Sequence, residues 1–156
     1  MAAFKTNAMR ILDSKKIAYN HYEYNPEITE GTRVAEMLGQ DNRKVFKTLV
    51  TVSAKGTNYV FVIPVAETLD LKKAAASVGE KSVSMIKQKE LLPLTGYIHG
   101  GCSPVGMKKL FPTMIHETAM EYDTVFVSAG QVGHQIEVDP KKLSELVRAK
   151  FGSIIV

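Results

Sequence analysis

One stretch decides how this chain is organised: Gly96-Tyr97-Ile98-His99-Gly100-Gly101-Cys102-Ser103-Pro104-Val105-Gly106-Met107-Lys108-Lys109. Its apolar start, Tyr97 to His99, predicts a short strand that breaks into a loop and then leads to a basic segment. Gly100 and Gly101 have no Cβ, so a ligand can approach their backbone closely. Pro104 fixes the exit of the loop, and Ser103 adds a hydroxyl. The alternative is an ordinary strand-to-helix turn, because glycine and proline are common in all turns.

Length and composition favour a globular protein with a single domain, residues 1–156. Hydrophobic residues make up 45% of the chain and charged residues 23%, as in ordinary soluble domains. No membrane span is expected, because the chain has no apolar run of about 18 residues. Met1–Asn7 lacks the apolar core of a signal peptide, and the single cysteine excludes an internal disulfide. Both features predict a cytoplasmic protein.

Charge and ligand spacing limit the classes of partner. The net charge of +4 permits a polyanionic partner without requiring one, and it predicts only weak, salt-sensitive binding of such a partner by the chain alone. One cysteine and four scattered histidines have no zinc-ligand spacing, so neither a metal nor another cofactor is expected. Several lysines are candidate phosphate contacts or plain surface residues: Lys72, Lys73, Lys87, Lys89, Lys108, Lys109, Lys141 and Lys142.

The remaining chain alternates between strand and helix patterns. Helices are predicted near residues 8–15, 32–38, 71–78, 87–92 and 140–150. Strands are predicted near residues 19–24, 45–52, 59–64, 83–85, 114–117, 124–128, 135–138 and 154–156. Thr6 or Asn7 can cap the first helix, Asp70 the third, and Asp139 followed by Pro140 the last. Strands joined by hairpins with helices between them predict an α+β fold with a mixed, mainly antiparallel sheet.

Lys47 is the residue that most clearly suggests a binding site. It lies in the middle of the predicted strand 45–52, on the face of Val45, Leu49 and Thr51. A lysine in an apolar strand is costly to bury unpaired, so it should reach a carboxylate, a ligand or solvent. Nothing nearby in the sequence indicates strong desolvation, which favours a cation that neutralises an anionic group over a lysine that acts as a base.

Candidates for a nucleophile or a general base are weaker. Cys102 lies three residues after His99, but a cysteine–histidine pair must meet in space, and no third orienting group is evident. His116 and His134 could act as general bases, although histidines with a structural role are more common.

Several short motifs, in this order, resemble the YbaK/EbsC family. They are Phe46-Lys47-Thr48-Leu49, Leu71-Lys72-Lys73-Ala74-Ala75, the stretch Gly96–Lys109, and Val127-Ser128-Ala129-Gly130. YbaK/EbsC proteins are free-standing relatives of the editing domain inserted in bacterial prolyl-tRNA synthetase. The glycine-rich stretch looks like the cysteine-specific branch, because Val105 stands where the alanine-specific branch tends to carry phenylalanine.

This resemblance implies a fold and a function. The implied fold is a mixed, barrel-like sheet flanked by helices. The implied enzyme removes cysteine from mischarged Cys-tRNA(Pro), and from Cys-tRNA(Cys) as a further substrate, beside prolyl-tRNA synthetase. In this branch the thiol of the bound cysteine is thought to attack its own ester carbonyl, so that the pocket supplies proximity in place of a protein nucleophile.

The resemblance also implies the site residues. Lys47 matches the functionally required lysine, which would hold the phosphate or ribose of the terminal adenosine. The implied substrate contacts are Tyr24, Thr48, Gly100, Gly101, Cys102, Ser103, Pro104 and Ser128. In two places the chain departs from the family: Glu27–Glu30 lacks an aromatic residue, and His134 stands where an apolar residue is expected.

Other functions remain open on the sequence alone. One is deacylation of another mischarged tRNA, such as Ala-tRNA(Pro), by attack of water. A second is a non-catalytic regulator that binds a nucleotide or a small molecule in the same pocket. A hydrolase that uses Cys102 as its nucleophile is the third.

Overall fold

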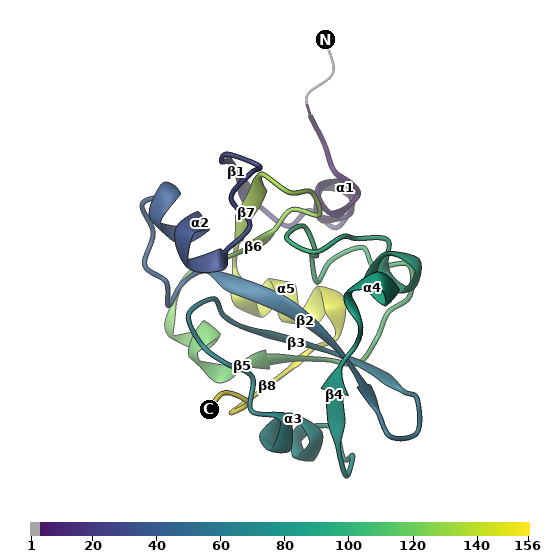
Figure 1. The fold of residues 1–156 in the computed structure, drawn as a ribbon. Helices are drawn as coiled ribbons and strands as arrows, with labels where there is room; N and C mark the ends of the chain where they lie inside the picture. Colours follow the sequence, from purple (N-terminus) through teal and green to yellow (C-terminus); the bar gives the residue numbers. More distant parts are fainter. Residues whose placement is uncertain (1–3) are drawn as a thin grey trace.

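Two β-sheets and five α-helices make up the computed structural model, which describes residues 4–156 (Figure 1). Residues 1–3 lie outside the described part. They belong to Met1–Asn7, which is predicted not to form a signal peptide. In chain order the elements are α1 (Asn7–Ser14), β1 (Tyr19–Glu23), α2 (Gly31–Met37), β2 (Phe46–Ser53), β3 (Asn58–Pro64), α3 (Leu71–Ser77), β4 (Val83–Met85), α4 (Gln88–Thr95), β5 (Thr113–His116), the 3-10 helix η1 (Glu117–Glu121), β6 (Val125–Ser128), β7 (His134–Val138), α5 (Pro140–Val147) and β8 (Lys150–Gly152).

Three helices begin at the capping residues that the sequence predicts. The side chains of Thr6, Asp70 and Asp139 accept hydrogen bonds from backbone N–H groups in the first turns of α1, α3 and α5. Pro140 occupies the start of α5, where its missing N–H group costs no hydrogen bond. Local side-chain chemistry therefore sets where these helices begin.

The strands divide between two sheets. The larger has the order β4-β2-β3-β5-β8, with antiparallel pairs around β2 and parallel pairs at β3–β5 and β5–β8. The smaller is antiparallel, with the order β1-β7-β6. A bridge between Val45 and Phe126 joins them. The predicted α+β fold with mixed, mainly antiparallel pairing is confirmed, although two sheets take the place of one barrel-like sheet.

The main hydrophobic core joins both sheets to helices α1 and α5. It contains Phe46 of β2, Ile136 of β7, Leu12 of α1 and Leu143 of α5. The other face of the β2–β3 pair packs against α3 in a second cluster around Phe61. Figure 1 shows α1 near the three-stranded sheet at one end of the molecule and α3 near β4 at the other. None of the helices described in residues 4–156 is long and apolar enough to cross a membrane.

The predicted strand at Tyr97–His99 is wrong. Helix α4 continues to Thr95, three residues beyond its predicted end, and stops at Gly96, whose φ of 87° suits glycine. The hydroxyl of Thr95 accepts a hydrogen bond from the N–H of Tyr97, whose own hydroxyl donates to the carbonyl of Val105 at 2.5 Å. These bonds turn Tyr97 into the core and remove it from strand pairing.

The C-terminal segment also differs from its prediction. Helix α5 ends at Val147, because Arg148 adopts a left-handed conformation with φ of 56°. Lys150, predicted to belong to the helix, instead begins β8 and pairs with β5. The predicted strand at 154–156 is reduced to one bridge, between Leu69 and Ile155.

Candidate functional site

A cavity of about 580 Å³ lies where the two sheets and the glycine-rich loop meet. Its walls come from the end of β1, the start of α2, the first half of β2, α4, the loop 99–102, and strands β6 and β7. A cavity of this volume suits a small molecule or one end of a larger one. Backbone, hydroxyl, amide and charged groups therefore converge on one space from distant parts of the chain.

Most of the predicted site residues line this cavity. Those that do are Tyr24, Lys47, Thr48, Gly100, Cys102 and Ser128. They come from β2, from β6, from the residue after β1 and from the glycine-rich loop, so the fold brings together residues more than 100 positions apart. Ser128 is held in place because its hydroxyl accepts a hydrogen bond from the N–H of Gly130 at 3.1 Å.

Gly101, Ser103 and Pro104 do not line the cavity. A Cβ on Gly101 would lie 2.8 Å from the backbone nitrogen of Val132, so only glycine fits where the loop packs against its neighbour. Ser103 is fully buried, and its hydroxyl accepts a hydrogen bond from the N–H of Val105. Pro104 lines a separate cavity of about 180 Å³. These three residues shape the loop from behind, and their predicted contact with a ligand is not supported by their location.

Lys47 is half-buried and lines the cavity. In the antiparallel pairing of β2 with β3, it lies opposite Ile63. The ion pairs found in residues 4–156 do not include its ammonium group. Burial lowers the pKa of Lys47, and the charge of Glu67 opposes this effect. The neighbouring sequence gives no sign of this desolvation. The side chain is thus a cation held at a cavity wall, affected by the charge of Glu67 but in none of the ion pairs found within residues 4–156.

Cys102 is a poor nucleophile in this setting. Its side chain is 8% exposed, and burial raises the pKa of its thiol to about 12, against the smaller opposite effect of a hydrogen bond with Thr95. The reactive form of cysteine is the thiolate, which such a pKa suppresses. His99 lines the same cavity, but no hydrogen bond between it and Cys102 is found in the described part of the chain.

The two histidines considered as general bases lie outside the cavity. His116 is buried, and its Nδ1 accepts a hydrogen bond from the N–H of Ile154 at 3.3 Å. Burial also lowers the pKa of His116. His134 contacts His21 on the other face of the three-stranded sheet. Neither is positioned to take a proton from a ligand in the cavity.

Sequence reasoning missed several polar residues of the cavity, and Gln135 and Glu30 are the most informative of them. Gln135 is 6% exposed, and its side-chain oxygen has no hydrogen-bond partner among residues 4–156. It pairs with Ser128 across β6 and β7, so strand alternation could have identified it once that pairing was known. Glu30, at the exposed side of the cavity, accepts a hydrogen bond from Thr32 at 3.3 Å. Its loop gave no such signal.

Comparison with known proteins relates the chain to a known family. A family model described as the aminoacyl-tRNA editing domain matches residues 25–146. The chain is 46% identical over 152 residues to EbsC of Enterococcus faecalis (strain ATCC 700802 / V583), which is described as a candidate Cys-tRNA(Pro)/Cys-tRNA(Cys) deacylase. That alignment covers 96% of this chain and 93% of the relative.

More distant matches agree with this one. A proline–tRNA ligase of Thermosipho africanus (strain TCF52B) is 29% identical over 107 residues, which are 69% of this chain and 18% of the ligase. A solved structure described as a candidate trans-editing enzyme for prolyl tRNA synthetase superposes with a TM-score of 0.83 at 24% identity. The superposition covers 98% of this chain and 99% of the solved chain, so the two folds correspond over their whole length.

Proposed function

The chain belongs to the aminoacyl-tRNA editing domain family, and from this premise we propose that it is a deacylase that removes cysteine from mischarged Cys-tRNA(Pro). The proposal extends to Cys-tRNA(Cys), the second substrate in the name of the relative. The observation that carries it is the cavity itself, which joins a lysine that forms no ion pair within residues 4–156 to a glycine loop and to buried hydroxyl and amide groups.

In this proposal each side of the cavity holds a different part of the substrate. The ammonium of Lys47 binds the phosphate or ribose of the terminal adenosine of tRNA, because a cation at a cavity wall attracts an anion. Thr48 and Ser128 contribute hydroxyl groups from neighbouring walls. The backbone at Gly100 lies beside the aminoacyl ester, where its polar groups can stabilise negative charge on the carbonyl oxygen.

The chemical step uses the thiol of the substrate. The cysteine sulfur attacks its own ester carbonyl carbon, forming a carbon–sulfur bond. The bond between that carbon and the ribose oxygen breaks, and the thiol proton ends on the released ribose hydroxyl. The products are a cyclic thioester of cysteine and free tRNA, so the protein need only hold the thiol near the carbonyl and exclude competing arrangements.

Among residues 4–156, the cavity wall shows no activated protein nucleophile, and this supports the mechanism. Cys102 is held as a thiol, and the hydroxyl of Ser128 hydrogen-bonds to a backbone N–H. In the described part of the cavity, the hydroxyl of Thr32 donates a hydrogen bond to the carboxylate of Glu30. Both residues lie at the exposed side of the cavity.

Glu30 favours a second candidate mechanism, in which its carboxylate activates water. Water attack would yield free cysteine, and it would act as readily on Ala-tRNA(Pro), because the thiol takes no part. A Glu30→Gln variant separates the mechanisms, since it abolishes water activation and leaves thiol attack intact.

A single-turnover deacylation assay tests the proposed function. Cys-tRNA(Pro) and Ala-tRNA(Pro) are incubated separately with excess protein, and both the rate and the chemical form of the released amino acid are measured. The proposal predicts rapid loss of cysteine as the cyclic thioester and slow loss of alanine. Equal rates would support water attack. Binding of an adenosine-ended substrate without cleavage would overturn the deacylase and favour a regulatory binding protein.

We also propose that residues 1–156 act as one editing domain in the cytoplasm, close to prolyl-tRNA synthetase. The support is the length of the match, since 96% of this chain aligns with 93% of a free-standing relative. The similarity to part of a proline–tRNA ligase supports the same partner.

A further inference from the structure

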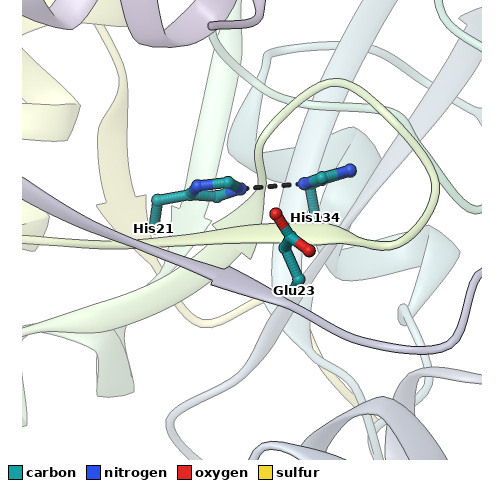
Figure 2. Close-up of side chains that lie close together, drawn as sticks. All are labelled: His21, Glu23 and His134. Carbon is teal, nitrogen blue, oxygen red and sulfur yellow. Dashed lines mark hydrogen bonds between the residues drawn. The ribbon is translucent and has the colours of Figure 1, made fainter. Parts of the chain in front are cut away.

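Three potential metal ligands meet on the smaller sheet, away from the cavity. His21 and Glu23 are two residues apart on β1, so their side chains share a face, and Glu23 is paired with His134 of β7. One ligand atom from each residue lies within 4.8 Å of the other two. Figure 2 shows the carboxylate of Glu23 turned toward the two imidazoles.

This cluster and the cavity occupy opposite faces of the same sheet. Gln135 follows His134 and lines the cavity, as does its partner Ser128 on β6. The face of the cluster instead carries Ile136 and Val138, which pack in the main core together with residues of α1. The cluster is therefore separate from the proposed editing site, and its test does not depend on that proposal.

The two imidazoles already form a pair with restricted orientation. Nε2 of His21 and Nδ1 of His134 are 2.8 Å apart, so one nitrogen carries a proton and the other offers a lone pair. The ring of Phe4 stacks on both, with centroid distances of 5.6 Å to His21 and 4.3 Å to His134. Stacking limits rotation of the rings and keeps the two nitrogens facing each other.

We infer that His21, Glu23 and His134 bind one divalent transition-metal ion, with Zn²⁺ as the best match. Imidazole nitrogen and carboxylate oxygen are both common zinc ligands. Two nitrogens at about 2.0–2.1 Å from a tetrahedral zinc ion lie about 3.3 Å apart, so the rings need to separate by only about half an ångström. Three protein ligands leave the fourth position to water.

A metal ion here would clamp β1 to β7 directly behind the cavity wall. Tyr24 follows Glu23, Gln135 follows His134, and both following residues line the cavity. An ion that binds the folded state alone raises the thermal unfolding temperature. The proposed clamp also explains why position 134 is a histidine. The family resemblance predicts an apolar residue there and does not account for the histidine.

Metal titration of the full-length chain tests this inference. The protein is stripped with a chelator and dialysed against Zn²⁺, and bound metal is counted by mass spectrometry. Titration with Co²⁺ reports coordination through its visible absorption. We expect one ion per chain, a Co²⁺ spectrum typical of four- or five-coordination, and a higher unfolding temperature with Zn²⁺.

Variants identify the ligands. His21→Ala, Glu23→Gln and His134→Ala should each weaken binding by about tenfold or more, as expected when a ligand or its support is lost. Glu23→Gln keeps the shape of an exposed side chain, so it keeps the fold and remains informative if a histidine variant does not fold. His99→Ala and Glu27→Gln change residues outside the cluster and should bind as the parent does. Less than one ion per chain, or equal binding by the Glu23→Gln variant, would overturn the inference.

Discussion

Thr48 and Gln135 face the same cavity from different sheets, and neither the hydroxyl of Thr48 nor the amide oxygen of Gln135 has a hydrogen-bond partner within residues 4–156. A buried polar atom without a partner costs stability, so folded proteins rarely keep one without a reason. Two such atoms at one cavity indicate that a bound ligand or water forms hydrogen bonds with them. The proposed substrate, with its ribose hydroxyls and amino group, offers suitable donors.

Replacing Gln135 with methionine should weaken substrate binding and leave the fold intact. A hydrogen bond between neutral groups contributes about 0.5–1.5 kcal/mol, so the protein concentration for half-maximal deacylation should rise about two- to tenfold. Stability should not fall, because an unsatisfied buried oxygen is removed. Gln131→Met, on the exposed turn before β7, is the matched control. Unchanged half-saturation in Gln135→Met would show that the amide does not contact substrate.

The thiol of Cys102 should react slowly and only at high pH. Because burial raises its pKa from 9.0 to about 12, the folded state holds the protonated form. This contribution to stability is fully present below pH 9 and is lost as the pH rises through 12. Alkylation measured from pH 7 to pH 11 should therefore be far slower in folded than in denatured protein. Rapid labelling of folded protein at pH 8 would reopen the role of Cys102 as a nucleophile.

A methyl group at Gly101 should damage both stability and activity. The added Cβ would lie 2.8 Å from the backbone nitrogen of Val132, and such overpacking costs about 1–3 kcal/mol. Relief of the clash would move Gly100 and Cys102 at the cavity. Gly56→Ala provides a control of similar cost: its φ of 87° disfavours alanine by about 1–2 kcal/mol, but it has open space and lies in the β2–β3 turn. Equal deacylation by the two variants, at equal stability, would contradict the role of the loop.

Lysines near the start of α4 should help to bind tRNA. Lys87 and Lys89 are exposed, and Leu91 in the same helix lines the cavity. A Lys87→Glu/Lys89→Glu variant should lower the deacylation rate at subsaturating protein and reduce its salt dependence, because fewer phosphate contacts release fewer counterions. Lys141→Glu/Lys142→Glu places the same charges at the start of α5, which contributes nothing to this cavity. An equal effect of both variants would indicate only general electrostatics.

The sequence predicted the local features of the fold well. Capping residues such as Asp70 and Asp139 act within one turn, so their effect can be read from neighbouring residues alone. The β2–β3 hairpin is likewise set by a short turn. The division into two sheets was not foreseen, because it depends on pairings such as Val45 with Phe126, far apart in the chain.

The residues of the candidate site also differ in how well the sequence predicts them. Lys47 and Gly100 were identified through short motifs, and the structure brings them to one cavity. Gln135 was missed, because a glutamine in a strand has no signal until its face and partner strand are known. Tyr97 was assigned to a strand by its apolar neighbours, but its hydroxyl and backbone hydrogen bonds hold it in a turn.

The deacylation rate of a Lys47→Ala variant tests the central claim most directly. Lys55→Ala, in the exposed β2–β3 turn, removes the same charge away from the cavity and serves as its control. With Cys-tRNA(Pro) at saturating protein, loss of a charged group that stabilises the bound reacting state should lower the rate about a hundredfold or more, while Lys55→Ala should match the parent. A Lys47→Ala rate within about threefold of the parent, a difference of well under 1 kcal/mol, would contradict the account.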